Sequence, residues 1–142
     1  MVFVSDEGSY LEAPIDTVWK FMSSGEVHSK THVSMRNRVQ KMLAPNVMEA
    51  TMERHWRGAW VKVANRLTLL PPVGYALEVL EGPFAGSKSF QIYRPEGPRT
   101  RVDVYGEFVS PVIPSAEIRT AVLEYLAQTF DEDAPAIRAY PR

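Results

Sequence analysis

The sequence predicts an α+β fold in which a curved antiparallel sheet of seven strands wraps around one long C-terminal helix, with one or two short helices after the first strand. Two observations predict it. From residue 33 to residue 109, apolar residues recur with a period of two in six segments that short Pro- and Gly-containing turns separate. One amphipathic segment of helical period follows at residues 115–130. Such a sheet around one helix leaves a hollow between the two, where we expect the function to lie.

The chain begins with a strand and a helix. Val2 to Leu11 is compatible with a strand that Gly8 interrupts, because glycine in a strand suggests a bulge. Pro14 then opens a helix, since proline suits the first helical turn, and apolar residues at helical spacing carry it towards residue 23. Residues 26–31 are short and polar, with room for one more helical turn at most.

Six strands follow as a meander, because short connections make neighbours in sequence neighbours in the sheet. Each break carries residues typical of tight turns. The expected strands are Val33–Met42, Val47–Trp56, Ala59–Leu70, Tyr75–Glu81, Ser87–Arg94 and Arg99–Val109. Ser115 is suited to cap the final helix, which we expect Pro135 to kink or end.

Composition excludes several classes of function. The 142 residues form one expected domain, 1–142, with 16 basic and 17 acidic residues and no cysteine. A cysteine nucleophile and Cys-based zinc sites are excluded, and a net charge of -1 provides no attraction for nucleic acid. No apolar run reaches the roughly 20 residues of a membrane span, so we expect no integral membrane association. We expect a cytoplasmic monomer or weak homodimer without a cofactor.

The segment from Tyr10 to Trp19 carries a family resemblance. It reads Tyr-Leu-Glu-Ala-Pro-Ile-Asp-Thr-Val-Trp, a strand followed by Ala-Pro and, one turn inside the helix, Val-Trp. In this segment and in its order of elements, over residues 1 to about 138, the chain resembles the START-like or Bet v 1-like (SRPBCC) superfamily. The resemblance implies a helix-grip fold around a hydrophobic cavity, of the polyketide cyclase/dehydrase and lipid-transport type. Members include lipid and sterol carriers, plant hormone receptors, aromatase/cyclases, coenzyme Q-binding proteins and co-chaperone domains, so the fold alone selects no function.

Strand alternation predicts which side chains face the hollow. Arg36, Arg38 and Gln40 are expected on the outer face, together with Trp60, which marks an oligomer contact unless a bulge near Gly58 buries it. The predicted ligand-binding residues are Asn37, Met52, Arg54, Trp56, Asn65, Tyr75, Phe90, Tyr125 and Thr129. Phe84 and Gly86, in the loop 82–86, are expected at the cavity mouth. Met22, Met35, Met48 and Met52 suit either an adaptable pocket or ordinary core filling.

Arg54 is the sharpest polar candidate, because an inward guanidinium must be paired. Its partner is either internal, such as Glu81 or a carboxylate of residues 131–133, or an anionic group of a ligand; alternatively its head reaches solvent at a sheet edge. Tyr75 and Tyr125 are the other candidate catalytic residues, as wall hydroxyls that hold a carbonyl or relay a proton, unless they are core aromatics with wet tips. Asn37 and Asn65 either orient a ligand or satisfy bulges and buried water.

His28 and His32 are four residues apart, the spacing of a metal pair on one helix face, with His55 as a third candidate ligand. Residues 31–34 read as the start of a strand, which breaks the helical register. We therefore interpret the histidines as surface residues and expect no metal site.

Three functions remain. The first is binding or transport of a small hydrophobic ligand, of lipid, polyketide or aromatic type, in the cavity. The second is a metal-free cyclase, aromatase or dehydratase that uses the same cavity, with Arg54 stabilising an enolate. The third is a co-chaperone-like interaction domain, which a filled interior would favour. The lack of an evident inward acid/base pair favours binding over catalysis.

Overall fold

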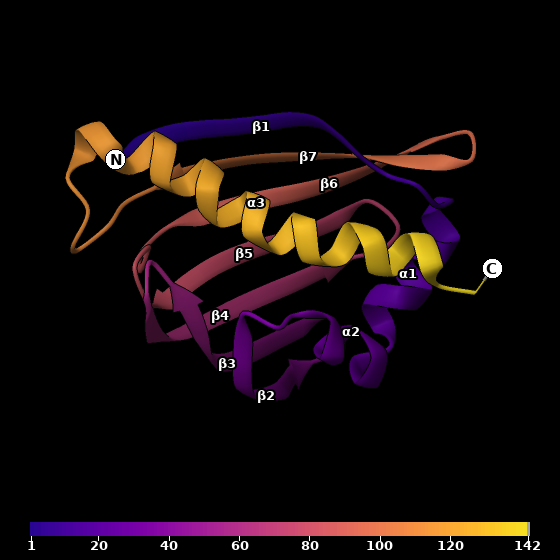
Figure 1. Cartoon of the computed structure of the whole chain (residues 1–142), viewed down its shortest axis with the longest axis horizontal. Helices are drawn as coiled ribbons and strands as arrows, with labels where there is room; N and C mark the ends of the chain where they lie inside the picture. The colour runs from indigo at the N-terminus through magenta and orange to yellow at the C-terminus, as the bar shows by residue number, and fades with distance from the viewer. Residues whose placement is uncertain (142) are drawn as a thin grey trace.

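A computed structural model describes residues 1–141, except for the side chain of residue 26. It confirms the α+β helix-grip fold: one antiparallel sheet of seven strands, in the order β1-β7-β6-β5-β4-β3-β2, is crossed on one face by the long helix α3 (Figure 1). The strands are β1 (Val2–Leu11), β2 (Met35–Ala44), β3 (Val47–Trp56), β4 (Ala59–Leu70), β5 (Gly74–Glu81), β6 (Lys88–Glu96) and β7 (Arg99–Phe108). The helices are α1 (Ile15–Ser23), α2 (Gly25–Thr31) and α3 (Ser115–Ala139).

Two helices are longer than the sequence predicts. Helix α2 has seven residues instead of one turn at most, and it ends at Thr31, directly before His32. Helix α3 continues through Pro135 to Ala139, so of the two expectations for the proline, a kink or an end, the end is wrong. Both short helices lie beside the C-terminal end of α3 (Figure 1). No helix in the described part of the chain is both long and apolar enough to cross a membrane.

The strand registers contain two irregularities that matter for the interior. In β1 the pairing with β7 shifts between Asp6 and Ser9, at Gly8, as the interrupting glycine predicts. In β2 the pairing with β3 shifts between Arg36 and Val39, where Asn37 adopts a left-handed conformation with φ of 53°. Asparagine is one of the few residues that tolerate this conformation. One extra residue in a strand reverses the side-chain phase beyond it.

The hydrophobic core is divided between the two ends of α3. At the N-terminal end, Ile118 and Val122 pack with Val4, Phe84 and Phe108. At the other end a second cluster joins the buried faces of α1 and α3 to β1, β6 and β7; its fully buried members include Leu11, Val18, Phe21 and Ile137. Burying each such side chain contributes about 1.5–3 kcal/mol, so both ends of α3 are held firmly against the sheet. The middle of α3 is left over a space.

A buried carboxylate fastens β1 to β7. Asp103 is fully buried, and its Oδ1 accepts the backbone N–H of Gly8 at 2.7 Å and the Nε–H of Arg101 at 3.0 Å. Burial opposes ionisation, but these hydrogen bonds and the nearby arginine charges hold the pKa of Asp103 below its ordinary value. The bulge at Gly8 is thereby tied to the neighbouring strand.

The outer face of β3 and β4 carries Trp60. Its side chain stays exposed, with the guanidinium of Arg36 at 4.1 Å from the ring and the His55 ring at 5.2 Å. Trp60 pairs regularly with His55 across the hairpin, so no bulge near Gly58 buries it.

Candidate functional site: a cavity under the long helix

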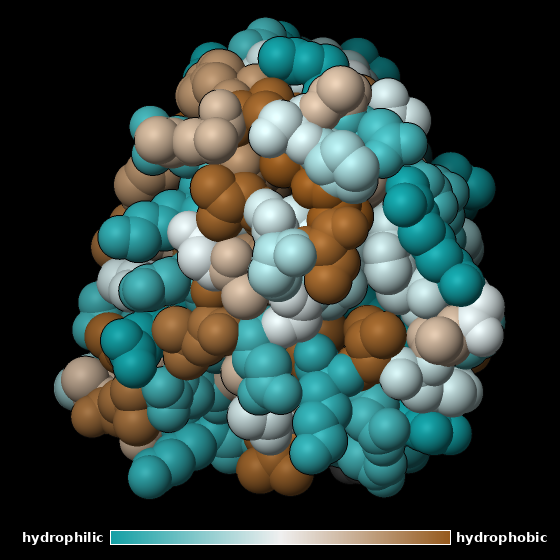
Figure 2. All heavy atoms as spheres, turned by 90° about the vertical axis from the view of Figure 1, so that its left-hand side faces the viewer, coloured by the Kyte–Doolittle hydropathy of each residue, from teal (hydrophilic) through white to brown (hydrophobic). Residues whose placement is uncertain are grey.

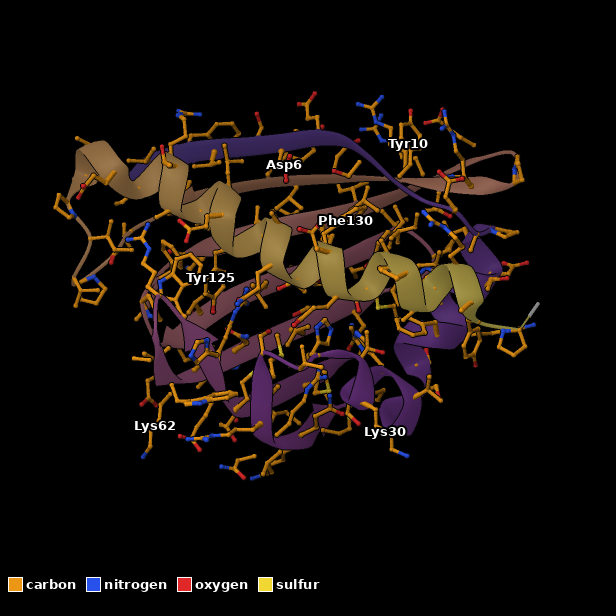
Figure 3. The ribbon with its side chains drawn as sticks, in the orientation of Figure 1. Asp6, Tyr10, Lys30, Lys62, Tyr125 and Phe130 are labelled. Atoms are coloured by element: carbon orange, nitrogen blue, oxygen red, sulfur yellow. The ribbon has the colours of Figure 1, made fainter. Side chains whose placement is uncertain are left out.

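A cavity of about 460 Å³ lies between the middle of α3 and the sheet. Its volume is in the range of small-molecule sites, which is roughly 300–1,000 Å³. Tyr125 and Phe130 reach it from α3 (Figure 3). Apolar side chains of β3, β4, β5 and β7 form much of the wall, and five methionines line it: Met22, Met35, Met42, Met48 and Met52. The core clusters at both ends of α3 therefore enclose a hollow, as the fold predicts.

Most of the predicted ligand-binding residues border this cavity. They are Met52, Arg54, Asn65, Tyr75, Tyr125 and Thr129. Trp56 is buried beside the cavity instead, with its ring 5.0 Å from that of Tyr125. Their roles in binding stay predictions.

Phe84 and Gly86 lie elsewhere than expected. Phe84 is 3% exposed and belongs to the core cluster with Val4 and Phe108, so it anchors its loop against the sheet and α3. Neither residue lines the cavity. The loop that holds them is fixed by packing and does not form the cavity wall.

Two residues predicted to line the cavity lie on the outer face of the sheet instead. Asn37 lies on the outer face, where its side-chain amide donates to Glu53, because the left-handed residue occupies the extra position of the bulge. Phe90 is 55% exposed, and the inner positions of β6 are Ser89, Gln91 and Tyr93. Hydrophobicity misleads in β6 because its inward side chains are polar ones that border the cavity.

The bulge in β2 places a guanidinium inside. Beyond it, Arg38, Gln40 and Met42 line the cavity, while Val39 is 62% exposed on the outer face. The prediction that Arg38 and Gln40 face outward is therefore wrong. The signal that could have revealed this is Asn37 itself, a residue suited to the left-handed conformation in the middle of a strand.

Arg38 is half-buried and lacks a full set of partners. Its Nε and Nη1 atoms are inaccessible to solvent and have no hydrogen-bond partner among the described residues. Burial lowers the pKa of the guanidinium, opposed by the negative charge of Asp133. Buried N–H groups without an acceptor are rare in folded proteins, so each needs an explanation.

Arg54, in contrast, is satisfied from within. Its Nε donates to the side-chain oxygen of Gln128 at 2.8 Å, and its Nη2 donates to the backbone carbonyl of Tyr125 at 2.6 Å. The guanidinium also stacks on the Tyr125 ring, 3.4 Å from its centroid. Of the alternatives for Arg54, an internal partner is thus observed, but it is an amide and a carbonyl of α3, not a carboxylate.

The tyrosines of the cavity are protonated phenols. Burial raises the pKa of Tyr75, Tyr93 and Tyr125, so all three keep their protons at neutral pH. The Tyr93 hydroxyl accepts the side-chain N–H of Gln91 at 2.8 Å. Tyr75 lies near enough to Arg38 and Asp133 for both charges to affect its pKa.

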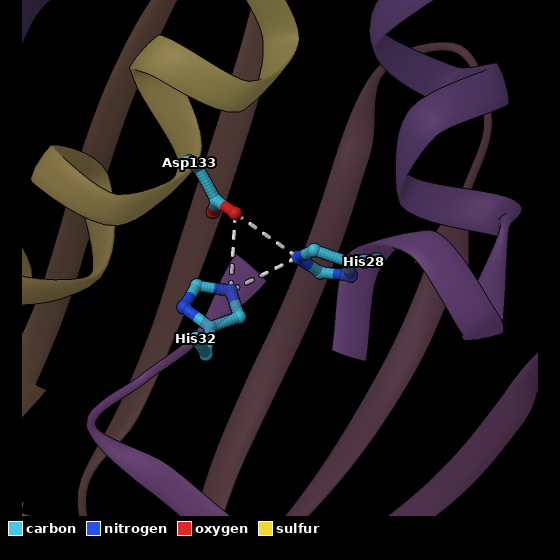
Figure 4. Close-up of side chains that lie close together, drawn as sticks. All are labelled: His28, His32 and Asp133. Atoms are coloured by element: carbon cyan, nitrogen blue, oxygen red, sulfur yellow. Dashed lines mark hydrogen bonds and ion pairs between the residues drawn. The ribbon is translucent and has the colours of Figure 1, made fainter. Parts of the chain in front are cut away.

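Two histidines and an aspartate meet at the cavity wall (Figure 4). His28 on α2, His32 just after it and Asp133 on α3 bring one side-chain atom each to within 4.8 Å of the other two. His32 is 4% exposed, so the interpretation of these histidines as surface residues is wrong. Because α2 continues to Thr31, directly before His32, no strand breaks the helical spacing that brings the two rings to the same side. His55, the third histidine, lies on the outer face.

Carboxylates set the charge of this cluster. Burial lowers the pKa of His32, but hydrogen bonds and charges from Asp133 and Glu132 outweigh it, and the pKa is raised. Burial likewise opposes ionisation of Asp133, yet its bonds to His28 and His32 hold its pKa below the ordinary value. The sequence shows the spacing of the histidines, but the meeting with Asp133, 101 residues beyond His32 in the chain, comes only from the fold.

Comparisons with known proteins support the fold. No family model matches the chain, and no curated protein matches its sequence. Among solved structures, the protein TTHA0849 from Thermus thermophilus superposes with a TM-score of 0.80 at 15% identity, covering 99% of this chain and 100% of that one. The Zhui aromatase/cyclase from a Streptomyces species gives 0.73 at 14% identity, over 96% of this chain and 90% of that one. A START superfamily protein from Mycobacterium smegmatis gives 0.71 at 14%, over 96% and 97%. The chain thus has the START-like fold, and these likenesses extend to the fold alone.

Proposed function

We propose that the protein binds a small, mostly apolar molecule carrying one acidic group, with the apolar part in the cavity and the acidic group on Arg38. The observation that carries this proposal is the pair of buried guanidinium nitrogens without a partner in a cavity of about 460 Å³. A carboxylate, phenolate or phosphate supplies the missing acceptors in a charge-assisted geometry. An anionic ligand group was one of the alternatives for Arg54, but the hydrogen bonds of Arg54 to α3 leave Arg38 as the residue for this role.

The surroundings of Arg38 fit an amphipathic ligand. The methionines and the apolar residues of β3 to β5 offer one broad hydrophobic wall, whereas Arg38, Tyr75 and the histidine cluster gather polar groups at one part of it. Such a division between apolar lining and a few convergent polar groups is typical of ligand sites.

A pair of fluorescent probes tests the proposal. Both 8-anilinonaphthalene-1-sulfonate and N-phenyl-1-naphthylamine are apolar, but only the first carries a negative charge. Removing a charged hydrogen bond costs about 1.5–3 kcal/mol, so Arg38→Met should weaken binding of the sulfonate about 10- to 100-fold and leave the neutral probe nearly unchanged. Arg36→Met, a change on the exposed outer face two residues away, is the matched control and should alter neither. Equal losses for both probes in Arg38→Met, or none for the sulfonate, would contradict the proposal.

Native mass spectrometry of freshly purified protein adds a second test. A retained small molecule with an acidic group, absent from Arg38→Met, would support the proposal. Protein that retains nothing and binds neither probe would count against it.

A cyclase-like enzyme is the second candidate, and one observation favours it. Groups that can accept a proton and groups that can donate one border the same cavity as Arg38. They are His32 with Asp133, and the protonated Tyr75. Groups of this kind can relay protons around an enolate that a guanidinium stabilises. One of the solved structures with this fold is an aromatase/cyclase. Turnover of a polyketide thioester that is lost in Arg38→Met would favour the enzyme over the carrier.

The interaction-domain hypothesis has less support. The interior is hollow, and on the end of the molecule shown in Figure 2 the hydrophobic residues lie in several groups among hydrophilic ones. The exposed Trp60 is the residue that favours it. Stacking with Arg36 and His55 gives that ring contacts within the chain itself.

A further inference from the structure

The histidine–aspartate cluster has a geometry that hydrogen bonds alone do not satisfy. His28 Nε2 lies 3.1 Å from Asp133 Oδ1, His32 Nε2 lies 3.0 Å from the same oxygen, and the two Nε2 atoms are 3.0 Å apart (Figure 4). An imidazole nitrogen carries at most one hydrogen, and an ionised carboxylate oxygen carries none. At most two hydrogens therefore serve three contacts of nearly equal length, so the contacts cannot all be straight hydrogen bonds.

The orientation of His32 sharpens this difficulty. Its Nδ1 lies 2.9 Å from Glu132 Oε1, and Glu132 in turn accepts the backbone N–H of Ser34 at 3.0 Å and the Ser34 hydroxyl at 2.8 Å. His32 therefore carries a hydrogen on Nδ1 and donates it to Glu132. In the neutral ring the Nε2 lone pair then points at Asp133, which places two acceptors 3.0 Å apart. A second proton on the His32 ring resolves this contact but leaves the 3.0 Å contact between the two Nε2 atoms, whereas a metal ion between the three atoms resolves all of them.

A single metal ion satisfies all three atoms. With metal–ligand bonds of about 2.1 Å, ligand atoms at right angles lie about 3.0 Å apart, and those at tetrahedral angles about 3.4 Å apart. The observed separations match the right-angled arrangement, in which three ligands occupy one face of the coordination shell. We infer that His28, His32 and Asp133 form a binding site for a divalent first-row transition-metal ion. Two imidazoles and one carboxylate suit iron, cobalt, nickel or zinc better than magnesium or calcium, which prefer oxygen ligands.

The surroundings have the features of a metal site. A metal-ligating histidine usually donates its other N–H to a carboxylate, which fixes the ring, and Glu132 does this for His32. The charges of Asp133 and Glu132 together balance a divalent cation, whereas two partly buried carboxylates without one need other positive charges. The spacing of His28 and His32 on and after α2 aims both rings the same way, and α3 supplies the carboxylate.

The site faces the ligand cavity. All three residues line it, so the remaining coordination positions are open to water or to an oxygen atom of a bound molecule. Arg38 lines the same cavity and the charge of Asp133 affects its pKa, so a metal ion here would lie on the side of the cavity that holds the proposed anion site. Metal binding itself does not depend on that ligand, and it goes beyond the proposed function.

Cobalt and zinc titrations of protein without a histidine tag test the inference. After dialysis against a chelator, wild-type protein should take up one Co²⁺ or Zn²⁺ per chain in calorimetry and show visible cobalt absorption, and it should ignore Mg²⁺. His28→Gln and Asp133→Asn should abolish saturable binding. Glu132→Gln should weaken it about 10- to 100-fold, the usual effect of an outer-shell partner. His55→Gln, which alters the histidine of the outer face, is the matched control and should bind like wild type.

Thermal unfolding keeps the test decisive if a variant folds poorly. Zn²⁺ should raise the Tm of wild type and of His55→Gln, because a ligand that binds the folded state stabilises it, and should leave the Tm of Asp133→Asn unchanged. No uptake by wild type, or uptake that His28→Gln and Asp133→Asn leave intact, would overturn the inference. Arg38→Met should still bind cobalt, so failure of the proposed anion site and failure of the metal site give different results.

Discussion

Replacing Arg38 by methionine should make the protein more stable. The Nε and Nη1 atoms of this half-buried side chain are inaccessible to solvent and unpaired, and a buried donor without an acceptor costs about 1–3 kcal/mol. Methionine keeps an apolar stem against the cavity wall and carries no donor. Partial exposure of Arg38 and its attraction to Asp133 reduce the gain, so we expect an increase of about 1–2 kcal/mol in the free energy of unfolding.

Urea unfolding followed by tryptophan fluorescence measures this change. At this chain length, about 1–2 kcal/mol corresponds to a rise of about 3–6 °C in Tm, and the m-value should stay the same if both proteins unfold in one step. Arg36→Met is the control: its ion pair with Glu53 is exposed, at 3.4 Å, and should contribute no more than about 1 kcal/mol to stability.

A decrease in stability on Arg38→Met would refute the reasoning. It would mean that the guanidinium has a partner in solution, and the observation that supports an anionic ligand would be lost. Stability that rises together with a loss of sulfonate binding is the combination expected of a residue kept for function at a cost to the fold.

Three further changes have definite expected results. Arg54→Met should lower the free energy of unfolding by about 2–4 kcal/mol, because it leaves acceptors on α3 unpaired. Arg57→Met, which breaks only an exposed ion pair, is the control and should change it by less than about 1 kcal/mol in the same urea assay. The pKa of Asp103 lies below its ordinary 3.8, so its ionised form stabilises the fold above that pH, and this contribution is lost as the pH falls through the lower pKa of the folded state. The free energy of unfolding, measured from about pH 6 to about pH 2, should therefore fall less in Asp103→Asn than in wild type. An equal fall in both proteins would contradict this. Gly74→Ala should destabilise by several kcal/mol, about 3 or more, because its Cβ would lie 1.8 Å from a carbonyl oxygen of β6, while Gly25→Ala, which meets no atom within 4 Å, should have a Tm no lower than wild type.

The sequence predicts the architecture well because each strand is a local pattern. Alternation along β3, β4, β5 and β7 correctly orients residues such as Arg54, Asn65 and Tyr75, since β3 and β4 pair regularly along their length and the shift between β4 and β5 follows Val79, near the end of β5. The turns with Pro and Gly place the strand ends within one or two residues of those observed.

The candidate site is harder to predict, because it depends on two departures from local pattern. One residue, Asn37, inserts a bulge that reverses the phase of β2 and brings Arg38 inside. The polar inner face of β6 reverses the usual hydrophobic rule. The meeting of His32 with Asp133 needs the position of α3 across the sheet, which spacing along the chain does not contain.

The methionines around the cavity bear on selectivity. Their unbranched, flexible thioether side chains repack at low cost around guests of different outline, unlike a wall of branched residues. Affinity should then change little among molecules that differ in the shape of their hydrocarbon part. It should change strongly among molecules that differ in the acidic group, because the rigid fork of Arg38 accepts few geometries. Such a protein binds ligands with different hydrocarbon parts but selects strictly for the acidic group.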